Sequence, residues 1–445
     1  MGGRDMATKQ EDIALEELRM ELGWTGLKEQ GGVITEEFLR QLQGANAVKC
    51  FREMSENDPI VGAMLYGMEM TIRGVPLEVE PYSEDPADEE AAEFLGSLFG
   101  DMSHSYHQFM SEWMAVPTYG FAPFEIVLKL RQGVKDTPGE SSQYKDGKIG
   151  IRKLAIRHPD TLLRWTFDET GGVQAMTQRI KSGTATIPIA KLLIFNVKSR
   201  KGNPEGTSLL RNAYVPYYRK KRIEDIEGAG IERDLAGIPH FTVPPGYLLT
   251  DAGTDEAANL AALKKIGKNL NNGEQACVFT PAIFDKDKNA LFDFKLVSSG
   301  GRRSFDTKSI KDGYSQQIAM TTMADVILLG HERVGTEALA DTKEGMWIEG
   351  MMSLLDARDD VLNRHLVPRI MALNGYKADR LPQFRHGDIE TVDLQKLGAY
   401  LQSLASAGLL MAPTETGELE REVLRVAGMP QPEPGEVGGG DGVEE

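Results

Sequence analysis

The fold is decided by a stretch that runs from Gly206 to Ala236 and reads GTSLLRNAYVPYYRKKRIEDIEGAGIERDLA. This stretch predicts one long helix, which would span about 45 Å at about 1.5 Å per residue. A second helical pattern of similar length follows at Arg303–Leu329, and its narrow apolar stripe carries Ile310, Tyr314 and Ile318 at four-residue spacing. A helix with so narrow a stripe covers little core, so we expect its flanks to meet water or another subunit.

A compact insert of mixed strand and helix character, residues 237–302, separates these two helices. The pattern predicts a helix at Asp255–Leu270 and strands at His240–Val243, Ala276–Thr280 and Leu291–Val297. A chain that runs down one helix, through a small module and back up the other builds a stalk. In a ring of copies such stalks would form the wall of a tube, whereas a stalk on a single chain has little use in catalysis.

The half of the chain that precedes the stalk predicts an α+β unit with a largely antiparallel sheet. Asp58-Pro59 opens a helix, with Asp58 as N-cap and Pro59 at the first helical position. Further helices are expected at Pro86–Phe99 and Tyr106–Val116. Strand patterns follow at Phe124–Leu130, Ile151–Ile156, Leu162–Phe167, Val173–Arg179 and Leu192–Val197.

The half that follows the stalk predicts a third long helix at Glu344–Leu373, which Pro368 should kink or end early. On this helix Asp356, Asp359, Asp360 and His365 are interpreted as a solvated face. Two short helices are expected at Leu394–Ala407 and Glu418–Ala427. The tail from Pro430 is rich in Pro, Gly and Glu, and we expect it to be disordered.

The composition limits the functional class. The 445 residues carry a formal net charge of −17, which argues against gripping DNA by its backbone but not against surrounding it. The two cysteines, Cys50 and Cys277, lie far apart, so the sequence indicates a reduced cytosolic setting without a disulfide framework or zinc knuckle. No apolar run approaches the roughly 20 residues of a membrane span, and the acidic N-terminus does not resemble a secretory signal.

Charge is segregated along the chain. Ten carboxylates and no Lys or Arg stand between Glu78 and Glu112, whereas the later helix carries a basic patch, Arg219, Lys220, Lys221 and Arg222. That patch predicts a solvated helix face, a contact with the acidic region of a neighbouring copy, or a contact with DNA, and the first is the commonest fate of such runs. His104 and His107, three residues apart on an expected helix, could bind a metal. No third ligand is specified, so structural histidines are favoured over a metal-dependent hydrolase built on residues 78–112.

Several short stretches, in this order and spacing, resemble the portal protein of tailed bacteriophages over about residues 53–390. Each is weak alone, but their combination is hard to imitate by chance. They are TIRGVPLEVEP (Thr71–Pro81), YGFAPFEI (Tyr119–Ile126), IRHPD (Ile156–Asp160), NPEGTSLLRNAY (Asn203–Tyr214) and ERDLAGIP (Glu232–Pro239).

The resemblance implies an α+β portal fold with named parts. These are an N-terminal arm (1–48), a wing (49–205), a stem of two helices (206–236 and 303–329), a clip (237–302), a tunnel loop (330–342), a spine helix with its return (343–390), a short helical crown (391–428) and an acidic tail (429–445). The crown is shorter than in the larger relatives, which puts any crown-dependent sensing of head filling in doubt.

The resemblance also implies a function. Family members form a dodecameric ring at one capsid vertex, pass double-stranded DNA during packaging and ejection, and dock the terminase large subunit and later the head–tail adaptor. Major capsid and scaffolding proteins are further expected partners, with no cofactor, metal, catalysis or membrane. The absence of a phosphate-binding loop motif suits a protein that carries a motor without being one. A smaller head–tail connector is disfavoured because connectors are generally shorter. The tunnel-loop residues expected to contact DNA are His331, Glu332, Arg333, Val334, Gly335, Thr336 and Glu337. The alternative is an ordinary connection between two long helices.

Overall fold

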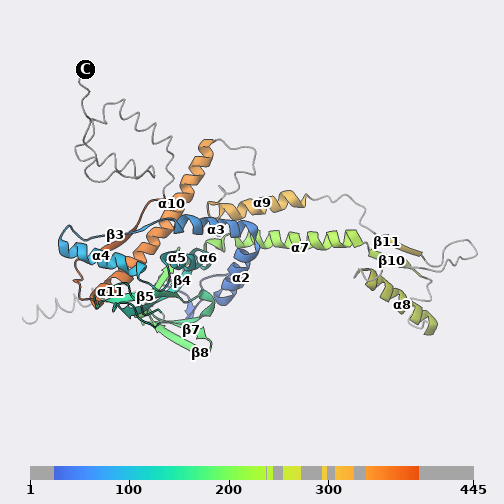
Figure 1. Cartoon of the computed structure of the whole chain (residues 1–445). Coiled ribbons are helices and arrows are strands. Elements are labelled where there is room, and N and C mark those ends of the chain that lie inside the picture. The colour runs from blue at the N-terminus through green and yellow to red at the C-terminus, as the bar shows by residue number, and fades with distance from the viewer. Residues whose placement is uncertain are drawn as a thin grey trace, which may run out of the picture.

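The computed structural model shows a body, a stem of two neighbouring helices that leaves one side of the body, and a small module at the far end of the stem (Figure 1). It describes residues 25–236 except 138, then residues 238–243, 254–271, 293–297, 306–324 and 337–389. The expected strand at Ala276–Thr280 and the crown helices lie outside these residues.

Strands of the body form small antiparallel sheets. A three-stranded sheet has the order β5-β4-β9, with β4 (Phe121–Leu130) between β5 (Ile149–Ile156) and β9 (Leu192–Asn196). A second sheet joins β6 (Leu162–Phe167), β7 (Val173–Ile180) and β8 (Gly183–Pro188). Two pairs complete the body, β3 (Leu77–Glu80) with β12 (Gln383–His386) and β1 (Glu29–Gln30) with β2 (Val33–Ile34). All these pairings are antiparallel, which confirms the predicted α+β class.

Helices pack against the first sheet and enclose the main core. Phe109 lies at its centre, with ring centroids 5.2 Å from Phe124, 6.0 Å from Phe99 and 6.2 Å from Phe195. The helices are α2 (Gly44–Asn57), α3 (Pro59–Arg73), α4 (Pro86–Gly100), α5 (Tyr106–Trp113), α6 (Ala115–Tyr119), α10 (Glu337–Val361) and α11 (Val367–Leu373). Short 3₁₀ turns lie at Arg40–Leu42, Pro159–Thr161, Ile189–Lys191 and Leu209–Arg211.

The stem consists of α7 (Tyr214–Ala236) and α9 (Thr307–Met320), which lie side by side (Figure 1). Both are shorter than predicted, because the chain before Tyr214 forms a 3₁₀ turn and the residues that follow Met320 form turns. At the far end, α8 (Thr254–Asn271) accompanies the antiparallel pair of β10 (Ile238–Thr242) and β11 (Asp293–Val297).

The third long helix differs from its prediction at two places. It begins at Glu337 instead of Glu344, so the last six residues of the expected tunnel loop are helical. It is also interrupted by a π-helical turn over Leu362–Leu366, immediately before Pro368. Proline has no backbone N–H and its ring crowds the preceding turn, so a widened turn accommodates it without ending the helix.

Two of the sequence stretches that carry the family resemblance meet where the stem joins the body. Gly120 has φ +94°, and a Cβ added there would lie 2.6 Å from the backbone nitrogen of Ser208. Gly206 has φ +58°, and a Cβ added there would lie 2.6 Å from the Gly120 carbonyl oxygen. Ser208 Oγ donates to the Thr118 carbonyl at 2.6 Å. Only glycine lets the two backbones approach this closely.

We therefore predict that Gly120→Ala lowers the free energy of unfolding by at least about 2 kcal/mol, since a left-handed residue would be strained and its Cβ would meet backbone atoms. Urea unfolding followed by circular dichroism measures the change. The matched control is Gly228→Ala on α7, where an added Cβ meets nothing within 4 Å. That control should gain about 0.5 to 1 kcal/mol in helix stability. Equal effects of the two substitutions would contradict the close approach.

Candidate assembly surface of the stem

A buried ion pair fixes the foot of the stem to the body. Lys220 on α7 is only 7% exposed, and its Nζ donates to Asp58 Oδ2 at 2.9 Å. The other oxygen of this carboxylate, Oδ1, accepts from the backbone nitrogens of Ile60 and Val61 at 2.9 and 3.2 Å. Asp58 therefore caps α3, as the sequence predicted, and at the same time holds α7.

A second contact to the body uses the next residue of the basic patch. Lys221 Nζ pairs with Glu53 Oε1 on α2, and Tyr217 Oη donates to the same oxygen at 3.2 Å. The hydrogen bond from Lys221 lowers the pKa of Glu53, although partial burial opposes the shift. The patch was predicted to meet solvent, a neighbouring copy or DNA. Lys220 does none of these, because it is buried inside its own chain. Lys221 is paired with an acid of its own chain.

The remaining two members of the patch, Arg219 and Arg222, are exposed. Within the part of the chain that the structure describes, neither makes an ion pair. The patch is therefore divided, with two lysines holding the stem to the body and two arginines left for solvent or a partner.

The face of α7 opposite to its buried side carries an exposed apolar stripe. Val215, Tyr218 and Ile226 are 42%, 56% and 62% exposed, and Arg222 lies between the last two at the same helical spacing. We call these four residues the α7 stripe. On another side α9 packs against α7, where Lys311 Nζ pairs with Glu227 Oε2 at 2.7 Å. Apolar side chains aligned on an uncovered helix face are typical of a contact surface.

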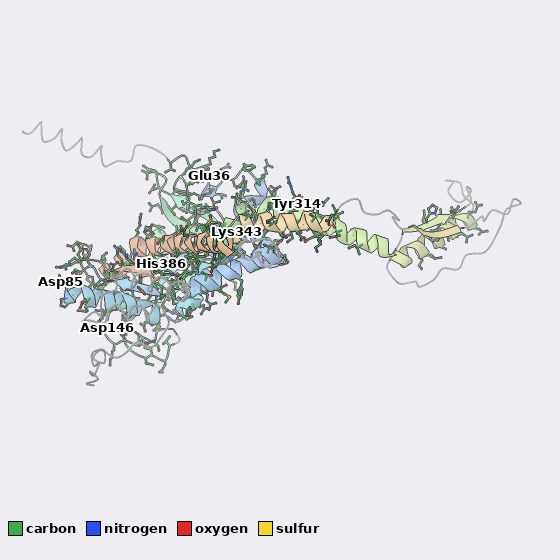
Figure 2. All side chains as sticks on the ribbon, turned by 90° about the horizontal axis from the view of Figure 1, so that it is seen from above. Glu36, Asp85, Asp146, Tyr314, Lys343 and His386 are labelled. Carbon is green, nitrogen blue, oxygen red and sulfur yellow. The ribbon has the colours of Figure 1, made fainter. Side chains whose placement is uncertain are left out.

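Five of the ten carboxylates between Glu78 and Glu112 pair with bases from distant parts of the same chain. Asp101 and Lys129 form a buried pair at 3.1 Å, and the Asp88 carboxylate binds Arg380 at 2.6 Å. Glu90 pairs with Lys148 at 3.1 Å. Figure 2 shows Asp85 at one end of the body, whereas Tyr314 lies on the stem at the opposite side. This region therefore stabilises the body.

The two candidate metal ligands do not share a helix, contrary to the prediction. Helix α5 begins at Tyr106 with Ser105 as its N-cap, so His104 precedes it and only His107 lies on it. Burial lowers the pKa of His104, and its two ring nitrogens are buried without a partner among the described residues. Among those residues, no group of three His, Cys, Asp or Glu side chains could hold a metal ion. Nothing in the described part supports the hydrolase alternative.

Sequence reasoning missed a buried charged pair on α10 and a half-buried carboxyl before the stem. Arg358 on α10 is fully buried and pairs with Asp359 at 2.7 Å, whereas Asp359 was predicted to lie on a solvated face. Burial raises the pKa of Asp359, and Arg358 opposes that shift. The burial of Arg358 could have been predicted from its spacing, because it lies three residues after Leu355 and four before Leu362 on the apolar face of the helix.

Glu205, in the stretch that leads into the stem, is the second missed group. Trp165 Nε1 donates to Glu205 Oε1 at 3.1 Å, and burial raises the pKa of this carboxyl to about 7.

The predicted tunnel-loop residues up to Thr336 lie outside the described residues, and Glu337 begins α10.

One comparison shows the family of this chain, and another shows which solved structures share its fold. Residues 48–423 match the family model described as "Portal protein of Mu bacteriophage". A chain from the virion of a native gene transfer agent (GTA) particle is 12% identical with a TM-score of 0.51, and a chain from the neck of an empty GTA particle computed with C6 symmetry is 11% identical with a TM-score of 0.51. Each alignment covers 86% of this chain and 94% of the other. These two likenesses show a shared fold.

A HK97 family phage portal protein from Corynebacterium diphtheriae aligns with 81% of this chain and 96% of its own length, at 12% identity and a TM-score of 0.38. As regards membranes, none of the helices in the described ranges combines the length and apolar character needed to cross a bilayer.

Lys220→Met should lower the free energy of unfolding by about 3 kcal/mol, because it leaves the buried Asp58 carboxylate without its cation. Arg219→Met, the neighbouring exposed residue, should change stability by less than about 0.5 kcal/mol. Combining Lys220→Met with Asp58→Asn should recover part of the loss, since an asparagine still caps α3. Urea denaturation of the four proteins tests this, and equal values for the two single variants would show that the pair is not an anchor.

Stability should also depend on the protonation of Glu205. Its folded pKa of about 7 lies above the ordinary value of 4.5, so the stability present at low pH is lost as pH rises through 7. Glu205→Gln stays neutral, so its stability relative to the original chain should increase between pH 4.5 and 7 and then remain constant. Urea unfolding across this range, read from tryptophan fluorescence, measures the difference. Parallel pH profiles for the two proteins would contradict the raised pKa.

Proposed function

The chain belongs to the family of the portal protein of Mu bacteriophage, and we propose that it assembles into a ring at one vertex of a phage capsid. In this proposal the ring is a passive channel through which double-stranded DNA enters during packaging and leaves during ejection. Twelve copies are the number that the family resemblance implies. The likeness of the fold to chains of a GTA virion and a GTA neck supports a place in the particle.

The observation that carries the ring is the α7 stripe. The buried residues of the stem lie at its foot, and beyond it an apolar face with Ile226 at 62% exposure points away from the body and from α9. An apolar stripe on a slender rod is costly in water, and the flank of an adjacent copy would cover it. Contacts between unlike faces of successive copies close into a ring when the rotation between them permits.

Negative charge suits passage of a duplex. With a formal charge of −17 per chain, the ring would repel the DNA phosphates and keep the duplex away from the wall. Strong phosphate contacts would stall a moving duplex. The tunnel loop, with His331 and Arg333 beside Glu332 and Glu337, remains our prediction for weak and reversible DNA contacts.

Partner docking follows from the arrangement of the parts. The module that carries α8, β10 and β11 stands at the far end of the stem (Figure 1), where it is accessible to large partners. We assign to this module the terminase large subunit during packaging and the head–tail adaptor afterwards. The body would face the major capsid and scaffolding proteins. No catalytic step is assigned to this chain.

Negative-stain images of the purified chain should show rings with a central hole, with a matching mass by light scattering. Ile226→Asp should shift the protein from rings towards smaller species, since the charge would be buried against a neighbour. Circular dichroism should remain unchanged, because Ile226 is 62% exposed and contributes little buried surface to its own chain.

The matched control is Val134→Asp, which places the same charge on an aliphatic residue that is 88% exposed in the loop after β4. This variant should form rings like the original chain. Rings that persist in the Ile226→Asp protein would remove the α7 stripe from the interface, and lone molecules at every concentration would overturn the proposed assembly.

A further inference from the structure

A groove with a volume of about 520 Å³ opens between the start of α2 and the first half of α7. It adjoins the α7 stripe, with which it shares Tyr218 and Arg222. Its walls are formed chiefly by Arg40, Lys49 and Cys50 on one side and by Tyr214, Tyr218 and Arg222 on the other.

The groove carries an excess of positive charge. Arg40, Lys49 and Arg222 are exposed, and none of them makes an ion pair among the described residues. The two acids in the lining are Glu53, which Lys221 already neutralises, and Asp225. A ligand with several carboxylates would therefore find cations without displacing existing partners.

The same groove also offers an apolar surface. Tyr214 and Tyr218 are stacked, with ring centroids 6.1 Å apart and planes inclined by 28°. Tyr218 and the adjacent Val215 are 56% and 42% exposed. The chemistry that fits is an acidic peptide with apolar side chains, because the cations take its carboxylates and the tyrosine rings its apolar groups.

A segment of this chain has that chemistry. Residues 10–24 read QEDIALEELRMELGW, with five acids against Arg19 as the only base. Leu15, Leu18 and Leu22 recur at a spacing of three and four residues, which is the period of an amphipathic helix. The other acidic segment, residues 430–445, is rich in Pro and Gly and has only two valines as larger apolar side chains.

The N-terminal segment is also tethered close to the groove. The described chain starts at Thr25, and Lys201 Nζ donates to the Gly26 carbonyl at 3.4 Å and to Glu36 at 3.1 Å. Arg40, in the groove wall, follows after only 15 further residues. A tether of this length places the segment at a high effective concentration near the groove of its own or an adjacent copy.

We propose that the acidic N-terminal segment, residues 10–24, docks in the groove between α2 and α7. Docking covers Tyr218 and Arg222 of the α7 stripe and leaves Val215 and Ile226 for a neighbouring copy. The contact does not depend on the proposed ring, because the segment can occupy the groove of its own chain or that of another copy.

The test uses the full chain with a benzophenone amino acid in place of Leu18. After irradiation, mass spectrometry should find cross-links concentrated in peptides that contain residues 40–53 or 214–225. The matched control carries the same photoreactive residue in place of Val437, in the other acidic segment, and should give little product there. A monomer-sized or dimer-sized product tells whether the docking is within one chain or between copies, and either supports the proposal.

Charge dependence separates docking from chance proximity. The triple variant Arg40→Glu, Lys49→Glu and Arg222→Glu should lower the yield about tenfold, as expected for the loss of three screened ion pairs. Arg219→Glu, an exposed neighbour outside the groove, should leave the yield unchanged. In the unaltered groove, about 1 M salt should also lower the yield, which keeps the test valid if the triple variant unfolds. Cross-links scattered over the body, or a yield indifferent to salt, would overturn the proposal.

Discussion

The position of the stem depends on one carboxylate. Asp58 uses one oxygen to cap α3 and the other to hold the buried Lys220 of α7 at 2.9 Å. Because both groups are almost excluded from water, their separation would leave an uncompensated charge in the interior. The close crossing of Gly120 and Gly206 adds a steric constraint next to this electrostatic one. The direction of the stem is thus set at its foot, by residues of the body that precede it in the chain.

In the body, too, acids of one segment pair with bases from distant parts of the chain. Half of the ten carboxylates between Glu78 and Glu112 pair with bases from other parts of the chain, among them Lys129, Lys148 and Arg380. A sequence run of one sign therefore overstates the surface charge, because folding brings bases to part of it. Four exposed basic residues that make no ion pair among the described ones, Arg40, Lys49, Arg219 and Arg222, lie together near the start of α7. This is where a partner of opposite charge would be recognised.

The sequence predicted the elements with a strong local signal. The cap at Asp58, the antiparallel strands Leu162–Phe167 and Val173–Ile180, and the helix pair of the stem follow from periodicity and capping residues. Strands β8 and β12 were missed, since Gly183–Pro188 and Gln383–His386 carry one large apolar residue each and pair with strands that lie beside them. The partners of Lys220 and Glu205 could not be predicted for another reason. Such a contact joins two segments that are far apart in the chain, and the sequence of either segment alone does not predict it.

Burial along the stem links the fold to assembly. On α7 the buried residues Tyr217 and Lys220 lie near the start, while every residue from Lys221 to Ile231 is exposed or half-buried. On α9 the burial runs the other way, with Ile318 and Ala319 buried near its end and Ile310 39% exposed. Both helices are therefore anchored at the shared foot and only sparsely packed beyond it. Short helices without such packing are marginal in water, so the outer stem should gain order from whatever covers it. If an adjacent copy covers the outer stem, its binding stabilises the folded helices by mass action. The wall of the channel would then be fully ordered only in the closed ring.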